Sequence, residues 1–207
     1  MASEVFKIPN QNAARQGGRE STIIMIKPEE VQAGRAWLIT DHIRRFCDEN
    51  GLEAYRAPVM LTREILERHY FGRGEKYVKA TGVKVAGTLE KEGVKCTRSD
   101  IELGERMLRN IVDGYTDKEA HLIVVRGHDA IQKVRSIKGS TTPSESEPGT
   151  IRKKFDTGMK LYEAIANGTP MRNIVHIPDN AEEADHDLLV FSPLIDRLER
   201  LAILERV

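Results

Sequence analysis

The sequence predicts an α+β fold in which helices cover one face of an antiparallel sheet. Two short apolar runs, residues 22–26 and 121–125, have the length and composition of buried strands. A segment with helical spacing of apolar residues follows each run. Together with strands predicted at 52–61 and 172–176, they give the order strand, helix, strand, strand, helix, strand. This order is the ferredoxin-like β-α-β-β-α-β arrangement, here with inserted segments and an extended C-terminal helix.

Composition narrows the class of protein. The chain has 207 residues, of which 40% are hydrophobic, enough for the core of one domain. Its 32 basic and 32 acidic residues balance, so we expect no specific nucleic-acid partner and no attraction to an anionic membrane. No apolar run reaches the length of a membrane span. Two cysteines, Cys47 and Cys96, lack metal-ligand spacing and suit a reducing compartment, so we expect a cytoplasmic protein.

The two ends of the chain differ in pattern. Residues 1–20 are polar and lack the apolar segment of a signal peptide, so we expect a flexible N-terminal arm. Residues 21–207 are expected to form a single domain.

The first half of the chain has clear boundaries. The run 22–26 is ended by Pro28, which places Lys27 at the carboxyl end of the strand, within reach of a phosphate. A helix is predicted over 33–49, and Thr62 is predicted to cap a helix over 62–70.

The middle of the chain is less regular. Residues 73–98 are rich in glycine and lysine, and their valines suggest a hairpin. The residues Ser99-Asp100-Ile101-Glu102 form a capping box that opens a helix. A further helix is predicted over 129–138.

A loop and a histidine dominate the second half. Residues 140–152 have neither helical nor strand period, and loops of this length in a compact domain are usually functional. After a helix at about 159–166, the strand 172–176 carries His176 to its end, beside a helix predicted over 180–189. A histidine next to a helix N-terminus is well placed to meet an anion and can act as a nucleophile. A last helix is expected to start at Ser192-Pro193.

Four separated motifs resemble the nucleoside diphosphate kinase family. They are Ile26-Lys27-Pro28, the segment from Val134 through the loop to Arg152, the string Arg172-Asn173-Ile174-Val175-His176, and Phe191-Ser192-Pro193. The resemblance spans residues 22–194, and its string Pro-Gly-Thr-Ile-Arg followed by Asn-Ile-Val-His is specific.

The resemblance implies a phosphotransferase. It implies transfer of the γ-phosphate of a nucleoside triphosphate to His176 and then to a nucleoside diphosphate, a ping-pong reaction that maintains NTP and dNTP pools. It also implies Mg²⁺ bound with ATP or another NTP, held mainly by the nucleotide phosphates with no metal ligand from the protein. The expected partners are nucleoside tri- and diphosphates and further copies of the chain in a homo-oligomer, a hexamer or a tetramer.

The resemblance also assigns the site. The implied catalytic residues are His176, Lys27 and Asp187. The implied nucleotide-binding residues are Lys27, Tyr70, Arg135, Thr141, Arg152 and Asn173. These residue types suit the chemistry, because phosphoryl transfer depends on positioning and charge neutralisation and guanidinium groups match phosphate oxygens. Asp187 would fix one imidazole nitrogen of His176 so that the other can attack.

Several residues depart from the family pattern. Pro178 stands where the family usually has a serine that helps to orient the carboxylate partner of the histidine, and Asp187 stands where a glutamate is usual. Two insertions, about 73–119 and 158–170, flank the expected site. The first covers the nucleotide-clamping helix pair, and Tyr77 is a candidate for the residue that stacks on the base.

Three other functions remain open. The departures favour, as the main alternative, a catalytically weakened nucleotide-binding regulatory protein on the same fold. A hydrolase that uses water as the acceptor is a second alternative. A binding module unrelated to nucleotides is a third, but it leaves the loop 140–152 unexplained.

Overall fold

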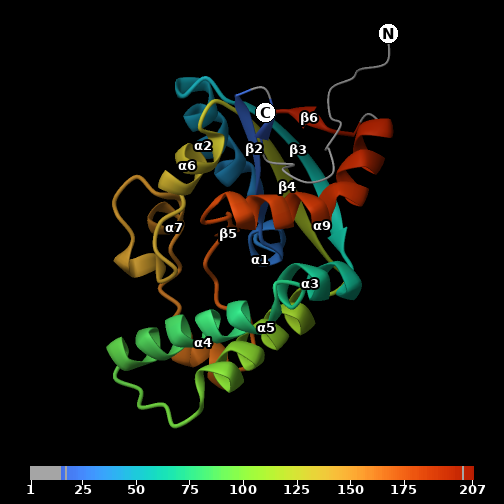
Figure 1. Cartoon of the computed structure of the whole chain (residues 1–207). Helices are drawn as coiled ribbons and strands as arrows, with labels where there is room; N and C mark the ends of the chain where they lie inside the picture. The colour runs from blue at the N-terminus through green and yellow to red at the C-terminus, as the bar shows by residue number, and fades with distance from the viewer. Residues whose placement is uncertain (1–14, 17, 202) are drawn as a thin grey trace.

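A six-stranded antiparallel sheet organises the computed structural model, which describes residues 15–16, 18–201 and 203–207 (Figure 1). Its path is β1 (Arg15–Gln16), β2 (Arg19–Ile26), β4 (Lys118–Gly127), β3 (Glu53–Leu61) and β6 (Glu205–Arg206). The short strand β5 (Val175–His176) also pairs with β2. The strands β5, β2, β4 and β3 thus form the predicted ferredoxin-like core.

Most of the predicted N-terminal arm, residues 1–20, lies outside the described residues. Its described parts, Arg15–Gln16 and Arg19–Glu20, pair with each other as β1 and the start of β2. At the other end, β6 returns to the same sheet and pairs with β3. The boundary between arm and domain stays a prediction.

The central strands are buried on both faces, which explains why they read as continuous apolar runs. In the register of β2 and β4, Ile24 is opposite Ile123 and Ile23 is opposite Val124. Because side chains alternate along a strand, the two pairs face opposite sides of the sheet. Each side therefore needs its own helical layer.

The two framework helices cover one face. They are α2 (Ala36–Glu49) and α6 (Ala130–Ser136), which lie on the same side of the sheet in Figure 1. Their apolar side chains pack with Ile24 and Ile123 in one core. The opposite face, which was expected to carry no helices, is covered by α3 (Arg63–Tyr70), α5 (Asp100–Tyr115) and α9 (Ala181–Arg200), which pack on Ile23 and Val124.

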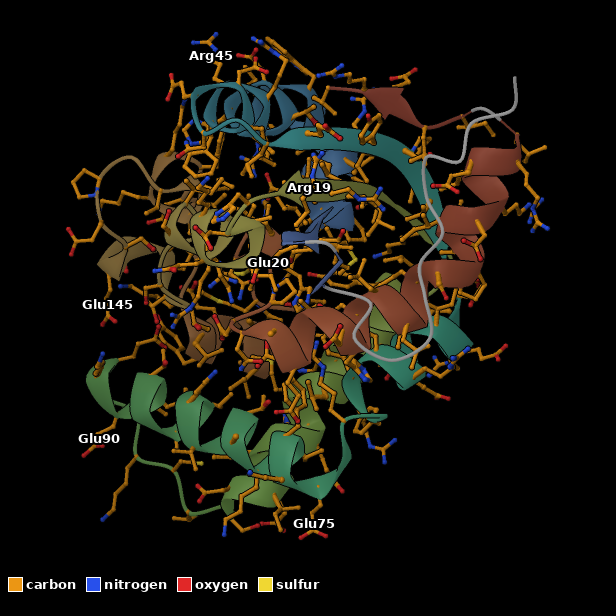
Figure 2. The ribbon with its side chains drawn as sticks, turned by 45° about the horizontal axis from the view of Figure 1, so that its top comes forward. Arg19, Glu20, Arg45, Glu75, Glu90 and Glu145 are labelled. Atoms are coloured by element: carbon orange, nitrogen blue, oxygen red, sulfur yellow. The ribbon has the colours of Figure 1, made fainter. Side chains whose placement is uncertain are left out.

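The predicted hairpin in residues 73–98 is wrong, because this segment contains helix α4 (Gly74–Lys91). Its buried residues Val78, Gly82, Val85 and Leu89 recur at helical spacing and pack along α5. A Cβ on Gly82 would lie 1.6 Å from the Asp100 carbonyl oxygen, so only glycine permits this close approach. Gly82, one of the glycines of this segment, is thus a contact point between the two helices. Exposed charges such as Glu75 and Glu90 point outward from α4 (Figure 2).

The predicted break before Ser192 is also wrong, because α9 continues through Pro193 to Arg200. Proline cannot donate to the carbonyl four residues earlier, here that of Leu189. The Ser192 hydroxyl donates to that oxygen instead, at 3.0 Å. The helix can therefore continue without an unsatisfied carbonyl.

The remaining elements are short. They are α1 (Pro28–Gln32), the 3₁₀ turn η1 (Pro143–Glu145), α7 (Ile151–Lys154) and α8 (Leu161–Ala166). The second insertion, which contains α8, joins the first through a small apolar core shared with α4 and α5. None of the described helices has the length and apolar character needed to cross a membrane.

Candidate active site

A pocket lies between the α4–α5 pair, the loop after α6 and the strand β5. Six of the eight predicted site residues line it, namely Lys27, Tyr70, Thr141, Arg152, Asn173 and His176. Other lining residues come from the insertions, among them Tyr77, Thr81 and Lys84 from α4 and Leu161 from α8. Asp187 is fully buried next to His176, and Arg135 lies outside the lining.

A strained turn positions the histidine strand. Ile174 has φ +65°, a left-handed conformation that a β-branched residue rarely adopts. The Val175 N–H donates to the Asn173 carbonyl at 2.7 Å, so the turn spans three residues and is a γ-turn of the rare, strained type. Arg152 donates to the carbonyls of Asn173 and Val175, both at 3.0 Å, and the Lys27 N–H donates to that of Ile174 at 3.1 Å. Residues that line the pocket thus hold the turn in place.

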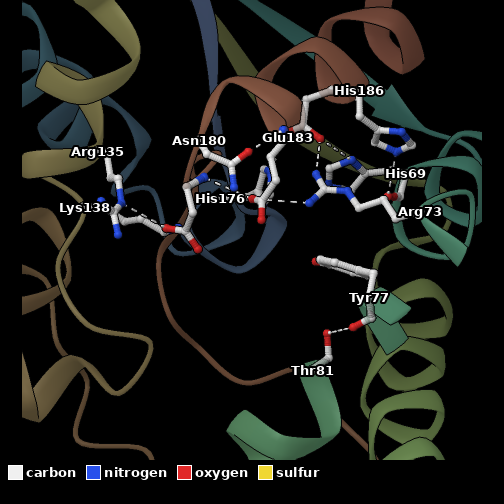
Figure 3. Close-up of polar contacts among 12 residues, drawn as sticks. His69, Arg73, Tyr77, Thr81, Arg135, Lys138, His176, Asn180, Glu183 and His186 are labelled. Atoms are coloured by element: carbon white, nitrogen blue, oxygen red, sulfur yellow. Dashed lines mark hydrogen bonds and ion pairs between the residues drawn. The ribbon is translucent and has the colours of Figure 1, made fainter. Parts of the chain in front are cut away.

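His176 is held as a neutral imidazole with one defined donor. Its Nε2 lies 2.6 Å from Asp187 Oδ2, so Nε2 carries the proton and donates it to the carboxylate (Figure 3). Burial lowers the pKa of His176 to about 3, although Asp187 opposes this shift. Burial alone would raise the pKa of Asp187, but the imidazoles of His69 and His176 hold it well below its usual range. At neutral pH, His176 Nδ1 is therefore an unprotonated nitrogen in a residue that lines the pocket.

The depressed pKa of His176 predicts a loss of stability in mild acid. The unfolded chain binds a proton to this histidine near pH 6.5, whereas the folded chain does so only near pH 3. The stability contributed by neutral His176 is therefore complete above about pH 6.5 and is lost as the pH falls through this window. We expect a decrease of about 2 kcal/mol in the free energy of unfolding between about pH 6.5 and pH 5 from this group. Urea unfolding of the wild type and of His176→Gln over this range measures it by difference, and parallel curves would contradict the expectation.

Asp187 has two partners that the sequence did not predict. Its Oδ1 lies 3.2 Å from His69 Nδ1 and forms an ion pair with Arg73. The His69 ring also contacts the ring of His176 edge-on, with 4.6 Å between centroids. His69 could have been suspected from its place beside Tyr70, but Arg73 lies in the inserted segment and carried no sequence signal.

Three buried cations share the pocket wall. Burial lowers the pKa of Lys27 to about 8 and that of Arg152 to about 10, and it also lowers the pKa of Lys138. Lys27 Nζ donates to Asn173 Oδ1, and the nearby Glu29 carboxylate opposes part of the lowering of the Lys27 pKa. Mutual repulsion adds to the effect of burial, because Arg152 further lowers the pKa of both lysines. A polyanion would relieve this repulsion. Lys138 was not predicted from the sequence, although it immediately precedes the loop.

Asp179 connects the predicted Arg135 to this group. Its carboxylate lies 2.7 Å from Lys138 Nζ, 3.6 Å from Arg135 Nε and 3.8 Å from Lys84 Nζ. The side chain of Arg135 is 60% exposed, so it lies at the rim of the pocket. A phosphate that entered the pocket would compete with Asp179 for these cations.

One described cluster has the residue types of a metal site. His69, His186 and Asp187 each place a potential ligand atom within 4.8 Å of the others. However, Arg73 already pairs with Asp187, and its guanidinium would repel a metal ion at that position. His186 Nε2 also lies 3.1 Å from the carbonyl oxygen of His69, so its ring is already engaged. Within this cluster, Asp187 and His69 therefore contact His176, and the carboxylate that already pairs with Arg73 is unsuited to a metal ion.

Comparison with known proteins decides the family. The profile described as "Nucleoside diphosphate kinase" matches residues 102–194. The nucleoside diphosphate kinase of Haloarcula marismortui is 30% identical over 169 residues, which cover 81% of this chain and 81% of that protein. This chain belongs to the nucleoside diphosphate kinase family. The fold agrees, since the crystal structure of an NDP kinase from Pyrobaculum aerophilum superposes with a TM-score of 0.72. That kinase is 27% identical to this chain, and the match covers 84% of this chain and 95% of the other.

Family membership confirms the prediction drawn from the four motifs. The chain is a phosphotransferase that moves phosphate between nucleoside tri- and diphosphates. The match includes the long loop after α6 and the histidine strand, which are the segments that build the pocket. The assignment of individual residues to steps of the reaction is a separate question.

Proposed function

We propose that Nδ1 of His176 is the nucleophile of a ping-pong kinase reaction. In the first half, Nδ1 attacks the γ-phosphorus of a nucleoside triphosphate. The Nδ1–P bond forms, the bond from the γ-phosphorus to the bridging oxygen breaks, and that oxygen leaves with the diphosphate. In the second half, the terminal phosphate oxygen of a nucleoside diphosphate attacks the phosphohistidine and restores the imidazole. The observation that carries this proposal is the 2.6 Å contact of Nε2 with Asp187, which reserves Nδ1 for bonding to phosphorus.

Charge neutralisation falls to the buried cations. Lys27, Lys138 and Arg152 line the pocket and are proposed to bind phosphate oxygens, with Thr141 and Asn173 as proposed neutral partners from the rim and the γ-turn. In a site withdrawn from water, these charges stabilise the transferring phosphoryl group more strongly than they would in solution. Arg135 would act at the rim once Asp179 releases it.

The base end of the nucleotide is proposed to contact α4. Tyr77 is partly buried and lines the pocket from the inner side of this helix. Its ring already stacks against the Arg73 guanidinium, whose carbon lies 4.7 Å from the ring centroid. An aromatic face accepts any base, so this contact suits an enzyme with low base selectivity. Tyr70 is more deeply buried and is proposed to form the wall beside the histidine.

Mg²⁺ is proposed to enter with the nucleotide. The wall around His176 is cationic, which suits an ion held by phosphates and water and not by a cage of protein carboxylates. Asp179 is one of two carboxylates in the pocket lining, the other being Glu183, and is proposed to meet the water shell of this ion. When bound, Mg²⁺ supplies further positive charge on the phosphate oxygens.

Assembly and location are proposed from the family resemblance. We propose a homo-oligomer, a hexamer or a tetramer, that works in the cytoplasm on the NTP and dNTP pools. Sedimentation velocity of the purified chain tests the assembly, and a sedimenting monomer would contradict it.

The decisive experiment is the intact mass of the protein after incubation with ATP and Mg²⁺. We expect a gain of one phosphate at neutral or alkaline pH and its loss when a nucleoside diphosphate is added. Acid should remove the added phosphate, because phosphohistidine is acid-labile. A protein that binds ADP yet never gains the phosphate would favour the regulatory alternative, and continuous loss of ATP without an acceptor would favour the hydrolase.

The pKa of Lys27 predicts how nucleotide affinity depends on pH. Because burial lowers the pKa of Lys27 to about 8, the free enzyme loses this charge as the pH rises through about 8. We expect the Kd for ADP to rise by about tenfold between pH 7.5 and pH 9.5, since removing one charged donor from a phosphate weakens affinity by about one tenfold step. Calorimetric titration measures the change, and Lys27→Met should show weak binding with a much flatter profile. A wild-type Kd that does not change over this range would contradict the assignment.

A further inference from the structure

We propose that Arg73 is a positioning residue that orients Asp187, and through it His176, and that it links this orientation to the wall of the pocket formed by Tyr77. The proposal deepens the kinase reaction described above and rests on it. It assigns a role to a residue of the inserted segment that no motif of the sequence singled out.

The first observation is the placement of Arg73. Its side chain is only 7% exposed, although it immediately precedes a helix on the surface. It pairs with Asp187 Oδ1, and its Nη1 lies 3.3 Å from Glu183 Oε2 (Figure 3). An arginine withdrawn from water with its fork directed at two carboxylates of α9 has a defined orientation.

The second observation concerns the donors available to Oδ1 of Asp187, the carboxylate oxygen that does not contact His176. The carboxylate must hold a fixed rotation so that Oδ2 accepts from His176 while Oδ1 is occupied. The turn before α9 contains Pro178, which is buried and has neither a hydroxyl nor an N–H to donate. The Oδ1 atom is instead held by Arg73 and by His69. The guanidinium thus supplies, from the N-cap of α4, a contact that the turn before α9 cannot make.

The third observation connects this contact with the pocket. Arg73 and Tyr77 are four residues apart at the start of α4, so their side chains lie on the same side. The Tyr77 ring stacks on the guanidinium that holds Asp187. A base packed against the other side of that ring would restrict Tyr77 and, with it, Arg73. Nucleotide binding would then favour the carboxylate rotation that keeps Nδ1 unprotonated.

The test compares Arg73→Met with a matched arginine that stacks on an aromatic ring but has no contact with Asp187. That control is Arg109→Met, since Arg109 is exposed and its guanidinium lies 5.5 Å from the Phe71 ring centroid. Arg73→Lys is a third variant, which keeps the positive charge but removes the fork. Three readouts are needed: the single-turnover rate of His176 phosphorylation by ATP and Mg²⁺, the Kd for ADP, and the ¹⁵N chemical shifts of the His176 imidazole, assigned with His176→Asn.

For Arg73→Met we expect phosphorylation of His176 to slow by about 10- to 100-fold. This is the effect typical of removing an outer-shell residue that orients an active-site ligand. The ADP Kd should change by less than about threefold, and the ¹⁵N shifts should move from the Nε2–H tautomer toward a mixture of tautomers. Arg73→Lys should recover part of the rate, and Arg109→Met should match the wild type in all three readouts.

An unchanged rate and an unchanged tautomer in Arg73→Met would overturn the proposal. If that variant does not fold, Arg73→Lys decides, and a wild-type rate and tautomer in Arg73→Lys would overturn it equally. Failure of the underlying reaction looks different, because the wild type itself would then gain no phosphate on His176.

Discussion

His176→Ala is expected to abolish phosphotransfer, lowering kcat by at least about 10⁴-fold, as happens when a covalent nucleophile is removed. The substitution removes the atom to which the phosphoryl group would be attached. Water could reach the γ-phosphate in the space left behind, but it would lack the fixed orientation that the Nε2 contact gives the imidazole. A coupled assay of ATP formation from ADP and a second triphosphate measures the loss.

Nucleotide binding should survive this substitution. The buried cations remain, so the ADP Kd is expected to stay within about threefold of the wild-type value, as for a group that acts mainly in the transition state. His186→Ala is the matched control, because it removes a neighbouring imidazole whose Nε2 contacts a backbone carbonyl and not the Asp187 side chain. Wild-type turnover in His176→Ala would refute the assignment of the nucleophile, and equal losses in both variants would point to general damage.

The second large effect is expected for Asp187→Asn, with a loss of about 10² to 10⁴ in kcat. An amide at this position can present its NH₂ group to Nε2, and Nε2 would then have to be unprotonated. The proton would move to Nδ1 and occupy the lone pair that attacks phosphorus. The substitution also removes the negative charge that pairs with Arg73, although the buried side chain keeps its size.

Asp187→Glu separates charge from geometry. It keeps the carboxylate and adds one methylene, so it should retain activity within about tenfold of the wild type if the acceptor can still reach Nε2. Steady-state kcat for the two variants, with ADP Kd as a check on the pocket, gives the comparison. Full activity in Asp187→Asn would mean that the tautomer of His176 is set by another group, and the proposed role of Asp187 would be withdrawn.

The sequence predicted the framework because its strands and most helices follow local rules. The runs 22–26 and 121–125 are apolar on both faces, and the helix opened by Ser99 has a complete capping box. The prediction from the sequence pattern was wrong where a tertiary contact overrode a local preference. Residues 73–98 were predicted to form a hairpin, but they contain α4, in which Gly82 lies against α5. Pro193 was predicted to start a helix but lies within α9, where the Ser192 hydroxyl satisfies the freed carbonyl.

The residues of the site also divide into those that could be predicted from the sequence and those that could not. Residues within the family motifs, such as Lys27 and Asn173, could be assigned to the site because the resemblance to the family implied it, and both line the pocket. Lys138 and Arg73 could not, since their importance arises from partners 41 and 114 residues away along the chain, Asp179 and Asp187. Long-range ion pairs of this kind leave no periodic trace in a single sequence. The roles assigned to all these residues stay predictions until the variants are measured.

The glycine contact between α4 and α5 has a mechanical consequence. A Cβ on Gly104 would lie 2.0 Å from the Val78 carbonyl oxygen, so the two backbones touch and cannot slide past each other. Any widening of the pocket on this side would therefore have to move both helices together as one rigid body. Such a motion would carry Tyr77 and Arg73 away from α9 together. Departure of the product and loss of the Arg73–Asp187 ion pair would then occur in a single movement. The rate of turnover would therefore depend on how easily the chain bends at the two ends of the α4–α5 pair.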